Sequence, residues 1–169
     1  YSHIWTFNEP GTFAYLYRFS VNNGQTWTYC DVNGVVEENE TMVTGVASIT
    51  GYVVEWCKIW DPLSYVAETG TSQLITSQVF VPGITDIETT ANDKITSQIA
   101  FATSETTLAN LPSLTWDTAL FTQKSYNNHE YRYNKAFTQA GTHYYYYRFS
   151  ADSGNTWKYC DKNGVITST

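Results

Sequence analysis

Three cysteines, Cys30, Cys57 and Cys160, are the residues best suited to form a covalent cross-link or to bind a metal. Zinc sites space their thiolates as Cys-x-x-Cys or combine them with paired histidines, and this sequence contains neither arrangement. Two interpretations remain open from residue type alone. The cysteines form a disulfide in an oxidising compartment, or all three are reduced and buried in a cytosolic protein.

Three histidines, His3, His129 and His143, are the candidate general bases. None lies in a His-Glu-x-x-His motif, and no Gly-x-Ser-x-Gly elbow supplies a nucleophile. Neighbouring carboxylates such as Asp86 and Glu88 lie on expected loops, where a solvated face is the default interpretation. The sequence therefore contains no catalytic constellation, and we predict a protein that is not an enzyme and that holds no cofactor.

Two short motifs suggest other chemistry. Asp161-x-Asn163-Gly164, like the earlier 31–34 segment, resembles the start of a calcium loop, but it lacks the later Glu that completes one. Because Asn-Gly favours tight turns, we expect a turn there and no metal site. Asn39-Glu40-Thr41 matches an N-glycosylation acceptor, which predicts that Asn39 lies on the surface.

An internal repeat determines how these residues are positioned. GTFAYLYRFSVNNGQTWTYCDVNGVV from Gly11 returns without a gap as GTHYYYYRFSADSGNTWKYCDKNGVI from Gly141. Because the period is about 130 residues, the chain holds the end of the module twice and its beginning once. We predict a C-terminal part of a module at 1–38, a linker at 39–52 and a complete module at 53–169, with the start of the first module outside this chain.

The repeat also separates the cysteines. Cys30 and Cys160 are equivalent positions near the end of a module, whereas Cys57 lies at the start of the complete one. We therefore predict a disulfide between Cys57 and Cys160, which would join the first strand to the last. Cys30 is then expected to pair with the missing start of its own module.

Alternating residues predict strands throughout. In residues 12–20, Phe13, Tyr15, Tyr17 and Phe19 share one face, and the copy places His143, Tyr145, Tyr147 and Phe149 there. That face keeps its bulk in both copies, so it is the expected core. Further strands are expected at 74–81, 95–103, 116–121 and 130–137. Short strands separated by turn signals favour an all-β, antiparallel, Ig-like or fibronectin-like sandwich, with almost no helix.

Composition limits the classes of partner. Nine basic against 16 acidic residues give a net charge of -7, which disfavours nucleic acid and anionic lipid. The sequence has no apolar run long enough to span a membrane, so we expect no membrane insertion. Aromatic residues reach 17%. Tyr144 and Tyr146 lie on the face opposite the expected core, and we predict that they form an interaction surface or cover a neighbouring strand or module.

Arg18 and Arg148 occupy equivalent positions of the repeat, between aromatic neighbours. We predict that each is held by ring stacking or by a carboxylate and takes no part in catalysis.

The segments WCKIWDP from Trp56, QVFVPGIT from Gln78, TWDTA from Thr115, HEYRYNKAF from His129 and the block at 141–164 resemble tandem Ig-like modules of large bacterial secreted or cell-surface proteins. The resemblance covers 53–164 and, as a partial copy, the first 34 residues. It implies a sandwich fold and an extracellular or cell-surface location, and it says little about activity.

Two functions follow as hypotheses. The first is a non-enzymatic structural or adhesive protein, in which tandem modules form a fibre, filament, sheath or stalk and bind neighbouring copies or adjacent modules. The alternative is a carbohydrate-binding module of a secreted enzyme, with glycans as partners, which the Tyr and Trp content favours.

Overall fold

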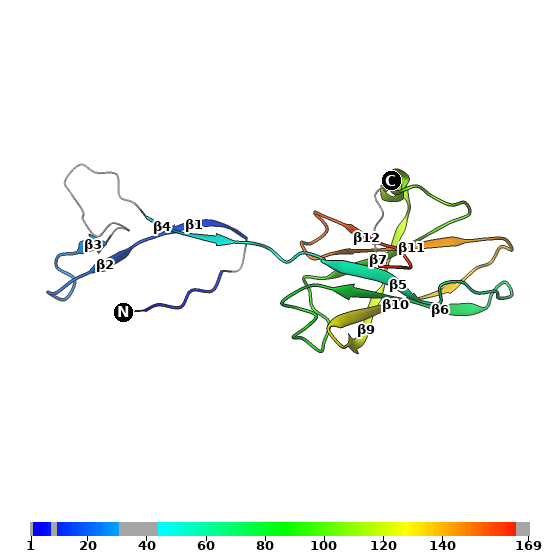
Figure 1. The fold of residues 1–169 in the computed structure, drawn as a ribbon, viewed down its shortest axis with the longest axis horizontal. Helices are drawn as coiled ribbons and strands as arrows, with labels where there is room; N and C mark the ends of the chain where they lie inside the picture. The colour runs from blue at the N-terminus through cyan, green and yellow to red at the C-terminus, as the bar shows by residue number, and fades with distance from the viewer. Residues whose placement is uncertain (1, 8–9, 31–43, 165–169) are drawn as a thin grey trace. The chain divides into compact units, whose positions relative to one another are not determined.

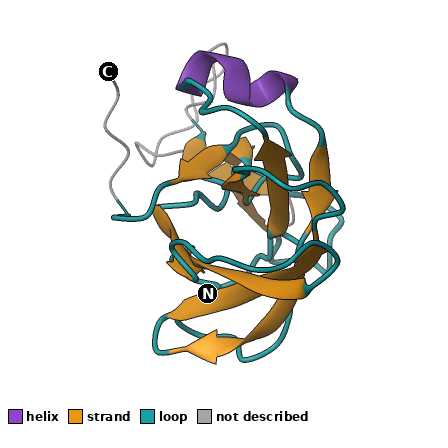
Figure 2. Ribbon diagram, turned by 90° about the vertical axis from the view of Figure 1, so that its right-hand side faces the viewer, coloured by secondary structure: helices purple, strands orange, loops and turns teal. Residues whose placement is uncertain are grey.

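The structure, a computed structural model, describes residues 2–7, 10–30 and 44–164. The chain divides into two compact units, Tyr1–Gly51 (unit 1) and Tyr52–Thr169 (unit 2). Strands dominate both units, and Figure 2 shows how little helix accompanies them. No helix of the described ranges is long and apolar enough to cross a membrane. The predicted all-β class is confirmed.

Unit 1 contains two antiparallel strand pairs among its described residues. Strand β1 (Gly11–Tyr15) pairs with β4 (Gly45–Ile49), and β2 (Tyr17–Phe19) pairs with β3 (Thr28–Cys30). The β1–β4 pair brings Tyr15 opposite Gly45, where any Cβ would collide with the phenol ring. Residues 45–49 thus form a strand within the segment interpreted above as a linker.

The expectation of one strand over 12–20 is wrong for unit 1. The strand breaks at Leu16, because β1 and β2 take different partners, β4 and β3. In unit 2 the equivalent chain is one strand, β11 (Tyr144–Ser150), because β7 (Thr96–Ala102) pairs with it along its whole length. A continuous neighbour therefore decides whether this sequence forms one strand or two.

Unit 2 is a sandwich of two four-stranded antiparallel sheets, ordered β5-β6-β10-β9 and β12-β11-β7-β8 (Figures 1 and 2). The remaining elements are β5 (Trp56–Asp61), β6 (Ser72–Phe80), the 3-10 helix η1 (Leu108–Ser113), β8 (Trp116–Thr118), β9 (Leu120–Ser125), β10 (Asn128–Ala136) and β12 (Lys158–Cys160). The predicted strand at 116–121 is two strands in different sheets. The chain changes sheets at buried Ala119, whose N–H donates to the Ser97 carbonyl oxygen at 3.0 Å.

The core lies between the sheets, on the face that alternation predicted. Tyr147 and Phe149 are fully buried, and the Tyr147 hydroxyl donates to the Ile75 carbonyl oxygen of the opposite sheet at 2.8 Å. Phe149 meets Tyr131 edge to face at 5.2 Å between ring centroids. Burying each large side chain contributes roughly 1.5–3 kcal/mol to the free energy of folding, so this face is a main source of stability.

The predicted disulfide between Cys57 and Cys160 is confirmed, with Cα atoms 5.2 Å apart. Both cysteines are buried, and it joins β5 of one sheet to β12 of the other. Next to it, the Ile59 N–H donates to the Asp161 carbonyl oxygen at 2.9 Å. The bond therefore closes the sandwich at the edge where the first and last strands of unit 2 meet.

Replacing Cys57 and Cys160 together by Ala is expected to lower the unfolding free energy of unit 2 by about 2–5 kcal/mol, because a chain cross-linked over 103 residues loses less entropy on folding. Urea unfolding followed by tryptophan fluorescence measures this loss. Cys30→Ala is the matched control and should leave the unit 2 transition in place. An unchanged midpoint in the double variant would contradict the prediction.

Candidate functional site

The repeated hairpin is the same local structure in both units. In unit 2, Tyr147 pairs with Cys160 and Arg148 with Tyr159. In unit 1, the equivalent β2 and β3 residues pair in the same register, Tyr17 with Cys30 and Arg18 with Tyr29. The inner aromatic pair also keeps its geometry, with centroids 6.3 Å apart in β11, 6.5 Å apart in β2 and an interplanar angle of 14° in each.

Side chains of unit 2 build the turn of its hairpin. The Ser150 Oγ accepts the Gly154 N–H at 2.8 Å, and the Asp152 Oδ1 accepts the Thr156 N–H at 2.9 Å. The Ser150 hydroxyl and the Thr156 hydroxyl each donate to the Asp152 carboxylate at 2.6 Å. These hydrogen bonds, that of Ser150 foremost, lower the pKa of Asp152 to about 2.

Unit 1 builds the same turn with an amide in place of the carboxylate. The Ser20 Oγ accepts the Gly24 N–H at 2.8 Å, and the Asn22 Oδ1 accepts the Thr26 N–H at 2.9 Å. The Asn22 amide donates to the Thr26 Oγ1 at 2.8 Å, which reverses the direction of the bond in unit 2. Asn is therefore a structurally tolerated substitute for Asp at this position.

The predicted stacking of the equivalent arginines is confirmed. The Arg148 guanidinium lies 4.1 Å from the centroid of Trp116 and 4.0 Å from that of Trp157. Its Nε and Nη2 donate to the Gln98 Oε1 at 2.8 and 2.6 Å, so an amide takes the place of the expected carboxylate. Arg18 lies over one indole, that of Trp27, at 4.1 Å.

The predicted surface tyrosines have different roles. Tyr144 is at the start of β11 and is 36% exposed. Tyr146 is half-buried, and its hydroxyl accepts the Thr106 N–H at 2.9 Å, which fastens the loop that follows β7. On the inner face, burial raises the pKa of Tyr145 to about 12, and its hydroxyl donates to the Pro62 carbonyl oxygen.

The other candidate residues fall into structural positions or outside the described ranges. His129 is fully buried, with its Nε2 2.9 Å from the Glu88 carbonyl oxygen, and the His143 ring stacks on Phe137 at 4.1 Å. The Asp161 Oδ1 accepts the Asn163 N–H at 2.7 Å, as in a turn. Asn39 and the 31–34 motif lie outside the described residues. Within the described part of the chain, no group of three or more potential ligands could hold a metal.

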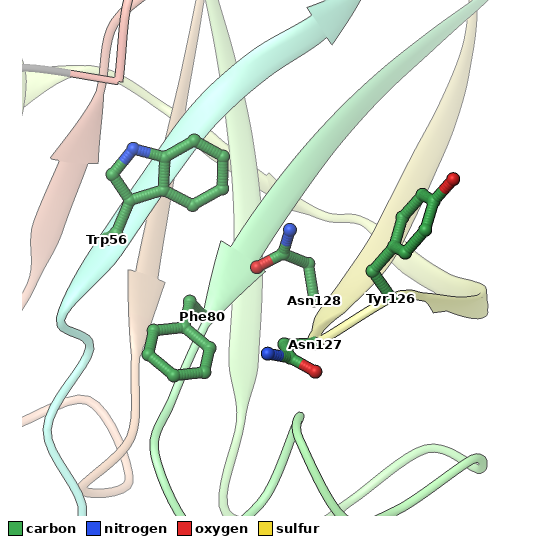
Figure 3. A pocket seen from close by; sticks show the side chains of 5 residues that line it. All are labelled: Trp56, Phe80, Tyr126, Asn127 and Asn128. Carbon is green, nitrogen blue, oxygen red and sulfur yellow. The ribbon is translucent and has the colours of Figure 1, made fainter.

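A groove that sequence reasoning missed opens on unit 2. It is a shallow depression of about 440 Å³ lined by Trp56, Phe80, Tyr126, Asn127 and Asn128 (Figure 3). Its residues come from β5, the end of β6, the turn between β9 and β10, and the first residue of β10. The only signal in the sequence was an aromatic residue, Tyr126, directly before the turn-favouring pair Asn127-Asn128.

The comparisons identify no relative: no family model, no curated protein and no solved structure matches this chain. The function is therefore inferred from the repeated hairpin, from how far its side chains are buried in each unit, and from the residues that line the groove.

We expect the lowered pKa of the Asp152 carboxylate to make the stability of unit 2 depend on pH in the acid range. Because its folded pKa of about 2 lies below the ordinary value of 3.8, ionised Asp152 stabilises the fold above about pH 4. That stabilisation is lost as the pH falls from about 4 to about 2. Thermal melting between pH 2 and 7 should show the wild type more stable than Asp152→Asn at pH 7, with the difference shrinking below pH 4. A difference that is constant with pH would contradict this role.

Arg148→Lys is expected to lower the unfolding free energy of unit 2 by about 1–2 kcal/mol. An ammonium group cannot lie flat between two indoles while donating two bonds to Gln98. Denaturant unfolding measures the loss. Arg132→Lys, on the exposed side of β10, is the control and should change stability little. Equal stability of the two variants would contradict the stacking role.

Proposed function

We propose that this chain is part of a non-enzymatic, extracellular or cell-surface structural or adhesive protein built from tandem Ig-like sandwich modules. Neighbouring copies or adjacent modules are its partners, in a fibre, filament, sheath or stalk. The observation that carries the proposal is one hairpin found twice in the chain, buried in unit 2 and exposed in unit 1.

The exposed fractions differ at equivalent positions. Tyr17 is 41% exposed in unit 1, whereas Tyr147 is fully buried in unit 2. Phe19 and Phe149 differ in the same way, at 40% and 0%. Since register, turn and ring geometry are the same in both hairpins, the difference lies in what covers them.

Three elements cover the hairpin in unit 2. Strand β7 pairs with the edge of β11, the opposite sheet supplies the Ile75 carbonyl to Tyr147, and Cys57 closes the end of β12. In the described residues of unit 1, β2 pairs with β3 alone. Fully burying a large aromatic side chain contributes roughly 1.5–3 kcal/mol, of which the partly exposed Tyr17 and Phe19 forfeit a share, and an unpaired edge invites another strand. A second module segment would remove both costs.

Cys30 supports the same arrangement. Its equivalent, Cys160, is bonded to Cys57, whereas Cys30 is a free, half-buried thiol. A segment equivalent to the start of unit 2 would bring a cysteine to this position. The Cys57–Cys160 disulfide supports the extracellular location, because such bonds persist in oxidising compartments. The packing roles of His129 and His143 support a function without catalysis.

The groove favours a second candidate function. The exposed Tyr126 ring and the half-buried Trp56 and Phe80 rings lie beside amide groups, which suits a carbohydrate-binding module with glycans as partners. This function is compatible with a tandem array, because the groove belongs to unit 2 alone.

Extending the chain by its own repeat tests the proposal. Residue 131 aligns with residue 1, so a copy of residues 53–130 placed before Tyr1 should complete the first module. We expect Cys30 to form a disulfide with the added copy of Cys57, identified by non-reducing peptide mass mapping, and residues 11–30 to gain protection from hydrogen exchange.

The control carries Cys57→Ser in the added copy and should leave Cys30 reactive towards maleimide. Two results would contradict the proposal. In the first, Cys30 stays free in the extended chain and residues 11–30 exchange as fast as before. In the second, the 169-residue chain is a monomer at micromolar concentration with residues 11–30 already protected.

A further inference from the structure

The outer face of the β5-β6-β10-β9 sheet carries two neighbouring rows of side chains. The register between strands pairs Trp56 with Phe80, and Asn128 follows at the adjacent β10 position. The next outward-facing row crosses all four strands and consists of Lys58, Gln78, Glu130 and Gln123. The residues between the rows point inward, as buried Cys57, Val79 and His129 show. One row is thus aromatic and amide, and the other is polar.

A carboxylate is held in the centre of the polar row. The Gln78 Nε2 donates to one oxygen of Glu130 at 2.7 Å, and the Gln123 Nε2 donates to the other at 2.8 Å. Gln78 is only 4% exposed, so this amide is fixed in place. Each carboxylate oxygen can accept a further hydrogen bond. Glu130 is therefore an oriented acceptor for hydroxyl groups that approach the face of the sheet.

Tyr126 is an unusual residue for its position. It occupies the turn between β9 and β10 with φ 54°, in the left-handed region that bulky side chains disfavour. Its side chain is 93% exposed, so the ring contributes almost nothing to the core. Strained backbone of this kind concentrates at functional sites. Gly or Asn would fit the same turn with less strain, and the exposed ring gains no packing that would offset it.

Tyr126 and the row of Trp56 and Phe80 bound the same groove. In Figure 3, the two β-strand aromatics lie on one side, the Tyr126 ring lies on the other, and the amides of Asn127 and Asn128 lie between them. The depression of about 440 Å³ is open, which suits a chain that passes over the surface. It combines flat apolar rings at its ends with hydrogen-bonding groups on its floor.

We propose that this face binds a neutral polysaccharide, with Tyr126 and Trp56 stacking on the apolar faces of pyranose rings. The Asn127 and Asn128 amides would donate hydrogen bonds to the sugar hydroxyls or accept hydrogen bonds from them, and the Glu130 carboxylate would accept them. A few placed polar groups among aromatic side chains are the usual composition of small-ligand sites. Glu130 and the net charge of -7 disfavour polyanions, including nucleic acids and sulfated glycans.

The ammonium group of Lys58, although it lies near the groove, does not favour an anionic ligand over a neutral polysaccharide. Lys58 Nζ lies 4.0 Å from the Trp60 centroid and 5.5 Å from the Trp56 centroid, so its charge rests against aromatic rings of its own strand. The site lies on the sheet opposite Tyr144, whose strand β11 belongs to the other layer. It rests on the second candidate function proposed above, for which it names the ligand class and the residues, and it does not depend on how unit 1 is completed.

Affinity gel electrophoresis of the whole chain tests the site, with laminarin, barley β-glucan, xylan, galactomannan and soluble starch in separate gels. We expect at least one polysaccharide to retard the wild type. Tyr126→Gly should weaken that binding about tenfold or more, as loss of a central aromatic contact does. The same variant should keep or raise the melting temperature, because Gly relieves the backbone strain. If Tyr126→Gly loses polysaccharide binding but keeps its melting temperature, the Tyr126 ring contacts the ligand and is not needed for folding.

Two further variants complete the experiment. Glu130→Gln keeps the side-chain size but removes the charged acceptor, and should also weaken binding. Tyr144→Ala, on the opposite sheet, is the matched control and should bind as the wild type does. The proposal is overturned if no polysaccharide retards the chain, or if Tyr126→Gly and Glu130→Gln both bind normally. Loss of binding in Tyr144→Ala alone, or a change in self-association in place of glycan binding, would also overturn it. Whether Cys30 forms a disulfide in the extended chain tests the tandem-module proposal separately, so the two proposals can fail independently.

Discussion

The contact between the inner face of β11 and the opposite sheet is the interaction on which unit 2 depends. Tyr147 and Phe149 are fully buried there, and the hydrogen bond from Tyr147 to the Ile75 carbonyl joins the two layers. Burial raises the pKa of the Tyr147 phenol, so the hydroxyl stays a donor. In unit 1 the equivalent residue, Tyr17, is exposed although the hairpin has the same register. Local interactions therefore form the hairpin, but a second sheet is needed to bury its aromatic face.

Aromatic residues have three different roles in unit 2, and the strand and face on which each lies determine its role. Those facing inward from β11 fill the core. On the other side of the same strand, Arg148 lies between Trp116 and Trp157, so the outer surface of that sheet is covered by its own stack. On the other sheet, the Lys58 ammonium lies against the Trp60 and Trp56 rings, Trp56 is half-buried, and Tyr126 is left 93% exposed.

Strand β5 couples the stability of the sandwich to the groove. Cys57 points inward into the disulfide, and its neighbour Trp56 points outward to line the groove. The indole also lies against Gly164, where a Cβ would collide with the ring and where φ is 76°. The chain after β12 therefore approaches Trp56 closely because residue 164 is glycine. The disulfide that closes the edge of the sandwich thus also holds one wall of the groove.

Much of this was determined by the sequence alone. Period-2 alternation identified Tyr147 and Phe149 as core, and the repeat was enough to pair Cys57 with Cys160 and to match Arg18 with Arg148. These features are local or follow from equivalence between two copies. Only the tertiary structure decided the break at Leu16, the change of sheet at Ala119 and the meeting of Trp56, Phe80 and Tyr126. The reason is that pairing between strands distant in sequence depends on hydrogen-bond register and available edges, which no short stretch of residues encodes.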